Sequence, residues 1–257
     1  MKLTQLFLTC CLLVFVSFDL TAQEEDDFRI NLGNVVSFDV TYGFHLPDGD
    51  LKDRFGNSSE IGAGLEYMTK ENNWIVGVHF GYFFGKEVKE DVLINLRTPE
   101  GNIIGSNGNW ANIQLLERGI HSNILVGKLF PLIKNNRRSG LRLTLGLGVL
   151  QHKIRVQQDS QTPIAQITGD YAKGYDRLSN GLSITEFVGY QHLSNNRLVN
   201  FYFGFEFVQA FTENRRDWDF TLDLKDDTKR TDLLMGIKFG WILPFYISSK
   251  ASENLRY

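Results

Sequence analysis

Residues 201–211 read FYFGFEFVQAF, and this stretch decides the fold. Phenylalanine occupies every odd position from Phe201 to Phe207, while Gly204 and Glu206 lie between them. Successive side chains of a β-strand point to opposite faces of a sheet, whereas a helix would scatter these phenylalanines around its surface. The stretch therefore predicts a strand with one strongly apolar face.

The same alternation recurs along the chain and predicts eight strands in an all-β fold. Their expected ranges are 35–46, 59–69, 74–85, 118–130, 140–155, 182–193, 198–212 and 231–246. Long and short connections alternate between these strands, so the long ones gather at one end of the sheet. This asymmetry is typical of bacterial transmembrane barrels, with short periplasmic turns and long surface loops. We expect one eight-stranded antiparallel up-and-down barrel over residues 35–246.

The second face of the strands indicates which side meets water. Opposite the apolar residues, several strands carry glycines and single charges, as in Gly62, Gly64 and Glu66 or in Gly204 and Glu206. Glycine weakens a strand unless something packs close to it, and the lumen of a narrow barrel is such a place. We therefore expect the polar face inside and the apolar face in lipid. A soluble, lipocalin-like barrel with the opposite arrangement is the alternative.

Aromatic residues mark both ends of the predicted strands. A first set lies at the short-turn ends and a second set at the long-loop ends, as expected for two interfacial girdles. The sets are Tyr67, Trp74, Phe130, Tyr190, Phe201 and Phe245, and then Phe44, Tyr82, Phe84 and Phe211.

The N-terminus has the layout of a secretory signal peptide over residues 1–22, with Lys2 before an apolar run and small residues before Gln23. Residues 23–34 then form a short periplasmic segment, and residues 247–257 form a periplasmic tail. Both cysteines, Cys10 and Cys11, lie in the leader, so the exported chain has no disulfide or thiol chemistry. A net charge of −3 gives no basic field for nucleic acid.

With its LTAQ cleavage site and Gly/Phe-rich strands, the chain resembles the small outer-membrane β-barrels of Gram-negative bacteria, in particular Bacteroidota. Its last strand resembles their C-terminal assembly signal, carried here by Lys238, Gly240, Leu243 and Phe245. The resemblance implies a porin-like location in the outer membrane, contact with its lipids, and insertion by the barrel-assembly machinery. The residues that follow this signal depart from the usual pattern, and suggest a periplasmic extension or a contact for a partner.

The inner face is expected to hold a polar network of both charge signs. Paired charges would plug the lumen and block conduction, whereas a proton or ion path, or a small narrow channel, is the alternative. No cofactor and no metal are expected, although Asp170, Asp176, Asp226 and Asp227 in the loops are possible cation ligands. The mixed charges of the long loops indicate loops packed on each other. The expected lumen residues are Asp39, Glu66, His79, Arg142, His152, Glu206 and Lys238.

Two further positions bear on function. The His-x-Ser-Asn stretch from His192 to Asn195 resembles that of outer-membrane lipid A deacylases, which implies His192 as base and Ser194 as nucleophile, but it falls at a periplasmic turn. Glu186 falls on the lipid face near the middle of its strand, which a bulge or a covering partner protein would explain. We expect a non-catalytic, structural or accessory subunit of an outer-membrane assembly, with other outer-membrane proteins as candidate partners. The alternative is a lipid A-modifying hydrolase.

Overall fold

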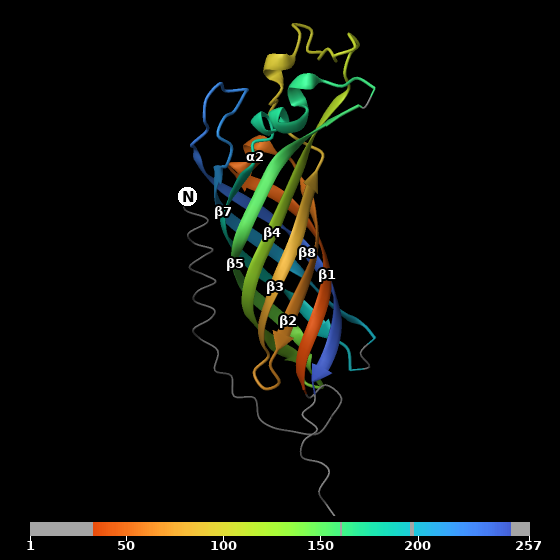
Figure 1. The fold of residues 1–257 in the computed structure, drawn as a ribbon. Coiled ribbons are helices and arrows are strands. Elements are labelled where there is room, and N and C mark those ends of the chain that lie inside the picture. Colours follow the sequence, from red (N-terminus) through yellow and green to blue (C-terminus); the bar gives the residue numbers. More distant parts are fainter. Residues whose placement is uncertain (1–32, 160, 196–197, 248–257) are drawn as a thin grey trace, which may run out of the picture.

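The computed structural model describes residues 33–159, 161–195 and 198–247, which form a closed barrel in which each strand pairs with its neighbours and β8 returns to β1 (Figure 1). All pairs are antiparallel, which confirms the predicted fold. The signal peptide, most of residues 23–34 and the tail after Ile247 lie outside the described residues. The strands are β1 (Asn34–Gly49), β2 (Ser58–Met68), β3 (Trp74–Gly85), β4 (Ile113–Ile133), β5 (Asn136–Gln158), β6 (Ser179–Leu193), β7 (Asn200–Asn214) and β8 (Lys229–Ile247).

Strands β4 and β5 are longer than the sequence predicted, and continue toward the long loops. This extension covers residues 113–117 of β4 and 156–158 of β5. Next to it, Arg118 pairs with Lys153, and Leu116 pairs with Arg155. Because charged side chains replace apolar ones on the outer face here, the alternation that reveals a strand in the sequence fades. The backbone ladder nevertheless continues to Gln158, so the hairpin rises above the apolar part of the wall.

The alternation of short and long connections is also confirmed. The short connections join Met68 to Trp74, Ile133 to Asn136 and Leu193 to Asn200, and Asn73 adopts a positive φ of 52° in the first of them. The long connections are 50–57, 86–112, 159–178 and 215–228, and they hold the short helices α2 (Leu51–Arg54), η1 (Ile94–Leu96), η2 (Ala165–Ile167) and η3 (Gly169–Gly174). These helices gather at one end of the barrel (Figure 1). No helix among the described residues is long and apolar enough to cross a membrane.

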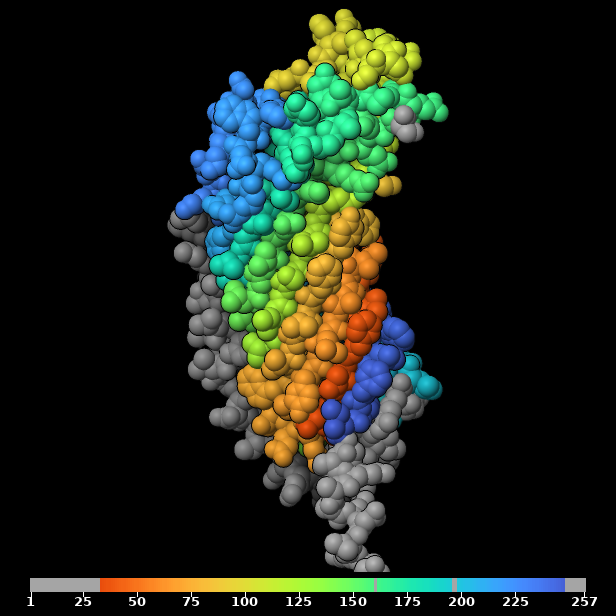
Figure 2. All heavy atoms as spheres, in the orientation of Figure 1, coloured from red at the N-terminus to blue at the C-terminus, as the bar shows by residue number. Residues whose placement is uncertain are grey.

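The side chains of the outer wall are largely apolar. Figure 2 shows one face of this wall. Phe205 is 68% exposed, Ile124 67% and Leu147 63%, although they belong to three different strands. The inner positions of the same strands are buried and mostly polar or glycine. The alternative of a soluble barrel is therefore wrong for this chain, because the apolar face of the strands points outward. A closed barrel with an apolar band outside and polar residues inside is the arrangement of a transmembrane β-barrel.

Glycine residues allow neighbouring strands and side chains of the barrel to approach each other closely. Gly204 on β7 pairs with Gly189 on β6, and a Cβ added at Gly204 would lie 2.3 Å from the carbonyl oxygen of Val188 and 2.9 Å from the ring of Phe187. No side chain fits there unless the two strands move. This close approach is the physical reason for the glycines that alternate with apolar residues along the strands.

Apolar layers close the lumen at both ends. At the short-turn end Val35, Met68, Ile75, Leu125 and Leu129 pack together, next to a smaller cluster of Phe187, Leu193, Tyr202 and Ile242. At the long-loop end a larger cluster joins inner strand residues to the loops. Its members include Leu51, Phe55, Phe83, Val92, Leu93, Ile103, Leu150, Ile154, Ile164, Ile167, Tyr175, Val208, Ala210 and Leu234.

Candidate functional site in the barrel lumen

Every residue that the sequence placed in the lumen is buried there. Asp39, Glu66, His79, Arg142, His152, Glu206 and Lys238 are each at most 6% exposed. They do not form one continuous row. The structure divides them among three polar groups and adds partners that the sequence did not suggest. Val208 and Leu234, from the larger apolar cluster, separate the third group from the second along β7 and β8.

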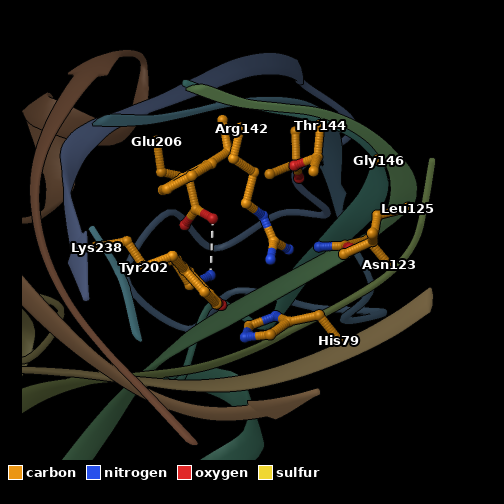
Figure 3. A pocket seen from close by; sticks show the side chains of 11 residues that line it. His79, Asn123, Leu125, Arg142, Thr144, Gly146, Tyr202, Glu206 and Lys238 are labelled. Atoms are coloured by element: carbon orange, nitrogen blue, oxygen red, sulfur yellow. Dashed lines mark hydrogen bonds and ion pairs between the residues drawn. The ribbon is translucent and has the colours of Figure 1, made fainter. Parts of the chain in front are cut away.

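The first group surrounds Arg142 and lies toward the short-turn end. The Arg142 guanidinium forms an ion pair with Glu66, hydrogen-bonds Gln191 Oε1 at 2.9 Å, and lies 4.2 Å from the centroid of the Tyr202 ring. The Tyr202 hydroxyl donates to Asp39 Oδ2 at 3.1 Å. A guanidinium held by a carboxylate and an aromatic face is well compensated for burial. Figure 3 shows Arg142 and Tyr202 pointing into the lumen.

The second group is centred on Lys238. Its ammonium lies 2.7 Å from Glu206 Oε2 and 3.1 Å from Glu60 Oε1, and His45 Nε2 lies 3.1 Å from Glu206 Oε1. Figure 3 shows the Lys238–Glu206 ion pair. If the Glu206 carboxylate had no cationic partner, it would argue against the expectation that the polar face of the strands lies inside the barrel. Its pairing with Lys238 instead confirms the orientation of this strand.

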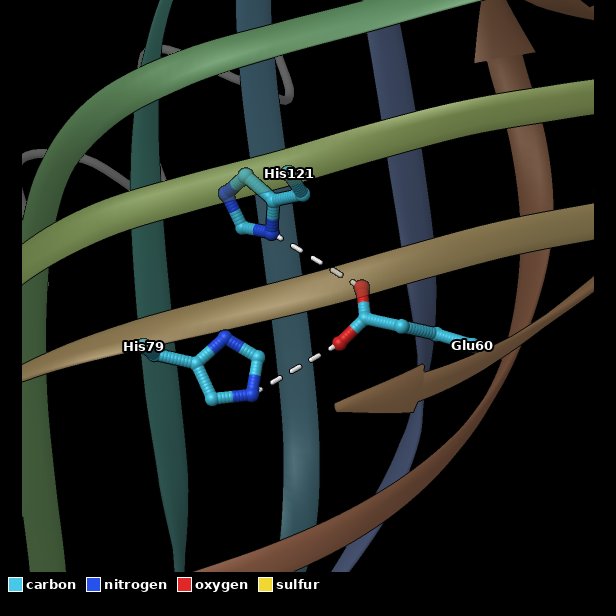
Figure 4. A group of neighbouring side chains, drawn as sticks. All are labelled: Glu60, His79 and His121. Atoms are coloured by element: carbon cyan, nitrogen blue, oxygen red, sulfur yellow. Dashed lines mark ion pairs between the residues drawn. The ribbon is translucent and has the colours of Figure 1, made fainter. Parts of the chain in front are cut away.

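Two histidines lie near the carboxylate of Glu60. His79 Nε2 is 3.8 Å from Glu60 Oε1, and His121 Nδ1 is 3.7 Å from Glu60 Oε2 (Figure 4). The sequence did not indicate Glu60, His45 or His121 as lumen residues. Glu60 could have been found by continuing the inner face of β2 upward from Glu66 in steps of two.

The third group lies toward the long loops. His152 Nε2 is 2.9 Å from Asp232 Oδ2, and the Thr212 hydroxyl donates to the same oxygen at 2.5 Å. The ring of Phe55, from the first long connection, meets the His152 ring edge-on, with centroids 5.5 Å apart. The first long connection therefore packs over the end of the lumen and covers this group.

The space that remains inside is small. A cavity of about 20 Å³ lies beside His79, Arg142 and Glu206, which is room for about one water molecule. With apolar layers above and below, the lumen has no continuous polar path among the described residues. The arrangement is that of a plug held by paired charges, as expected for a barrel of eight strands.

The loops are tied together by ion pairs between different connections. Arg54 Nε lies 2.9 Å from Glu90 Oε2, Arg177 pairs with Glu90 and lies 3.1 Å from Asp219 Oδ2, and Arg216 pairs with Asp176. The predicted packing of loops on each other is therefore confirmed.

The acidic residues that were possible cation ligands in the loops are paired with basic side chains. Asp170 pairs with Lys173, Asp176 with Arg216, Asp226 with Arg230 and Asp227 with Lys225. They lie apart in four separate pairs, so they do not converge on a common ion.

His192 is at the short-turn end of β6, as predicted. Its Nδ1 is 2.9 Å from the hydroxyl oxygen of Ser139, which is fully buried, and its ring packs against Phe201. The Ser194 amide donates to Asn200 Oδ1 and to Val199 O in the adjoining turn. One ring nitrogen of the proposed base is thus engaged by a different serine.

Glu186 lies on the outer wall, as the sequence indicated. The pairs Leu145–Glu186 and Glu186–Phe207 fall in registers that run without a shift along both neighbouring strands. The bulge that would have turned this residue inward is therefore absent, and that explanation is wrong. Its outward neighbours on β6 include Leu182, 65% exposed, and Val188, 42% exposed.

The residues of the proposed assembly signal alternate across β8. Lys238 and Gly240 point inward, where a Cβ at Gly240 would meet the Tyr202 ring at 2.3 Å, whereas Leu243 and Phe245 are exposed on the outer wall.

Of the predicted girdle residues, Tyr67, Trp74 and Phe245 are exposed at the short-turn end, and Phe44, Tyr82 and Phe211 at the other.

The closed strand order, the apolar wall and the plugged polar lumen define the class of this chain: a transmembrane β-barrel with the fold of the outer-membrane type. Among solved structures, it is similar to Ail, the attachment invasion locus protein of Yersinia pestis. The TM-score is 0.39, with 13% sequence identity over 81% of this chain and 99% of that one. A second structure, of Ail in complex with the heparin analogue sucrose octasulfate, gives a TM-score of 0.36 and 12% identity over 81% of this chain and 99% of that one. No protein-family model and no curated protein matches the sequence.

Proposed function

We propose that this chain is an integral outer-membrane barrel that acts as a non-catalytic, structural or accessory subunit of a larger outer-membrane assembly. The observation that carries the proposal is the position of Glu186 on the apolar wall, in a strand without a bulge. A carboxylate at the middle of the lipid-facing wall has a cost, which a partner protein with a polar or cationic group at that depth would remove.

The closed lumen supports the same proposal. A barrel whose interior is filled by ion pairs and sealed by apolar layers offers no route for a solute. The surfaces left for function are then the outer wall and the loops. In planar bilayers we expect no steady conductance, and a stable large conductance would support the narrow-channel alternative instead.

The outer wall can be tested by crosslinking in cells. A photoreactive residue in place of Phe207, which pairs with Glu186, should give a discrete crosslinked product of higher mass. The matched control is the same residue in place of Val78 on β3, a wall position that is 50% exposed but lies away from β6.

The substitution Glu186→Leu separates a partner contact from a chance neighbour. We expect it to abolish the product formed at position 207 while the barrel still folds, as judged by heat-modifiable migration in gels. An unchanged product in Glu186→Leu, or equal products at positions 78 and 207, would contradict the proposal.

A further inference from the structure

The middle of the lumen has more negative than positive permanent charge. Between the apolar layers, the carboxylates of Asp39, Glu60, Glu66 and Glu206 face the two permanent cations of the described lumen groups, Arg142 and Lys238. An uncompensated buried charge is costly, because few water molecules can reach it. The excess can be neutralised by protonation of a carboxylate or a histidine, or by a metal ion.

Glu60, His79 and His121 are arranged as ligands would be. All three are buried, and their ligand atoms lie within 4.8 Å of one another. The separations of 3.8 Å and 3.7 Å between the histidine nitrogens and the Glu60 oxygens are too long for hydrogen bonds. Two ligands of a tetrahedral zinc ion, each about 2.1 Å from the metal, lie about 3.4 Å apart. A small inward movement would therefore complete the coordination.

A second contact holds the His121 imidazole in the required orientation. His121 Nε2 is 3.0 Å from the Thr185 hydroxyl, which leaves Nδ1 directed at Glu60 without a hydrogen-bond partner. In His79 the nitrogen that faces Glu60, Nε2, is 3.1 Å from the Thr41 hydroxyl, and metal binding would replace this contact. Metal-bound histidines commonly have such an outer contact at the second nitrogen, which fixes the tautomer and the ring plane. His121 meets this condition through Thr185.

We propose that Glu60, His79 and His121 bind a divalent transition-metal ion, such as Zn²⁺, inside the barrel. A donor set of two imidazoles and one carboxylate suits zinc, cobalt or nickel rather than calcium or magnesium, which prefer oxygen ligands. The cavity of about 20 Å³ beside His79 has room for a water molecule as a fourth ligand.

Lys238 is compatible with this site. Its ammonium is closer to Glu206 Oε2, at 2.7 Å, than to Glu60, which it contacts through Oε1 at 3.1 Å. The other oxygen, Oε2, faces His121. Glu206 therefore keeps Lys238 in place while Glu60 turns toward the ion.

The apolar layers determine how the ion enters. Both ends of the lumen are sealed by clusters of buried side chains, so an ion would be captured while the barrel closes. Once inside, it should exchange slowly. The ion would crosslink β2, β3 and β4 inside the barrel, because these strands carry the three ligands.

The experiment uses the protein refolded from urea into detergent, with and without Zn²⁺, followed by removal of free metal and measurement of bound metal. Wild type should retain about one zinc ion per chain, and Co²⁺ in its place should give the visible absorption of a low-symmetry site. The variants His121→Gln and His79→Gln should each lose at least nine-tenths of the bound metal. The control is His152→Gln, which removes another buried lumen histidine that pairs with Asp232 instead; it should retain the wild-type content.

Lys238→Met provides an independent test, because it removes the cation that shares Glu60 with the ion. Its refolding yield, read from heat-modifiable gel migration, should become dependent on added Zn²⁺, whereas the yield of wild type changes less. The proposal is overturned if folded wild type holds no zinc above the level of His121→Gln, or if His152→Gln loses the metal equally. A Lys238→Met yield that does not respond to Zn²⁺ would also count against it.

Discussion

The ammonium of Lys238 lies 2.7 Å from the carboxylate of Glu206, although the two residues are not opposite each other in the sheet. Lys238 pairs with Gly204, and Glu206 pairs with Gly236. Each charged side chain thus faces a glycine across the strand pair, and the ion pair runs diagonally over the space that the glycines leave. The glycines of the inner face therefore leave the space in which the charged side chains of neighbouring strands meet.

We predict that removing one partner of this ion pair is much worse than removing both. Glu206→Gln or Lys238→Met alone should lower the free energy of unfolding by about 3–5 kcal/mol, because an unpaired charge is left in the lumen. The double variant should recover at least half of the larger single loss. Urea titrations of the barrel in detergent or lipid vesicles, followed by tryptophan fluorescence, would measure this. Equal and additive losses would show that the two side chains do not interact.

We predict that Gly204→Val prevents or severely impairs barrel closure. The new side chain would collide with the backbone of Val188 and with Gly189, whose Cα lies 2.5 Å from the added Cβ. The matched control is Ala63→Val, at a position on the outer face of β2 where added volume points to lipid. Heat-modifiable migration should be lost in Gly204→Val and kept in the control. Normal folding of both variants would mean that the lumen is wider than the structure shows.

We predict that part of the loop cap loosens below about pH 4, with Asp226 contributing to the change. Burial alone would raise the pKa of Asp226, but hydrogen bonds from Arg230 and Thr228 outweigh it and lower the pKa to about 2. A carboxylate with a lowered pKa stabilises the folded loop above its unfolded pKa, and this contribution is lost as the pH falls toward 2. Pepsin cleavage of the 215–228 connection should therefore increase between pH 4 and pH 2. Asp226→Asn should be cleaved faster than wild type at pH 4, and the difference should shrink at pH 2.

We predict that Ser194→Ala leaves the acyl composition of lipid A unchanged. The reason is geometric: His192 Nδ1 already contacts Ser139, and the turn of Ser194 lies at the short-turn end of the barrel. Mass spectra of lipid A from cells with wild type, Ser194→Ala or no protein should coincide. A fully acylated species restored by both the deletion and Ser194→Ala would instead support the hydrolase alternative.

Much of the barrel could be read from the sequence because strand periodicity is a local property. Phe201 to Phe207 and the matching runs on the other strands reveal which residues face lipid, and the lengths of the connections reveal the two ends. The extension of β4 and β5 could not be read in this way. Next to it, Arg118 and Lys153 interrupt the apolar face, while the backbone pairing continues to Ile113 and Gln158.

The candidate site depended on tertiary structure. Periodicity placed His79 and Glu206 inside and Glu186 outside. It did not show that Glu60, His79 and His121 would converge from three strands, or that no bulge would turn Glu186 inward. Which inner residues share a level is fixed by the tilt and stagger of the strands when the barrel closes. The sequence by itself determined what faces lipid and what faces the lumen, since each strand carries that pattern alone. The closed barrel decided which lumen residues meet, because only closure sets the register of all strands at once.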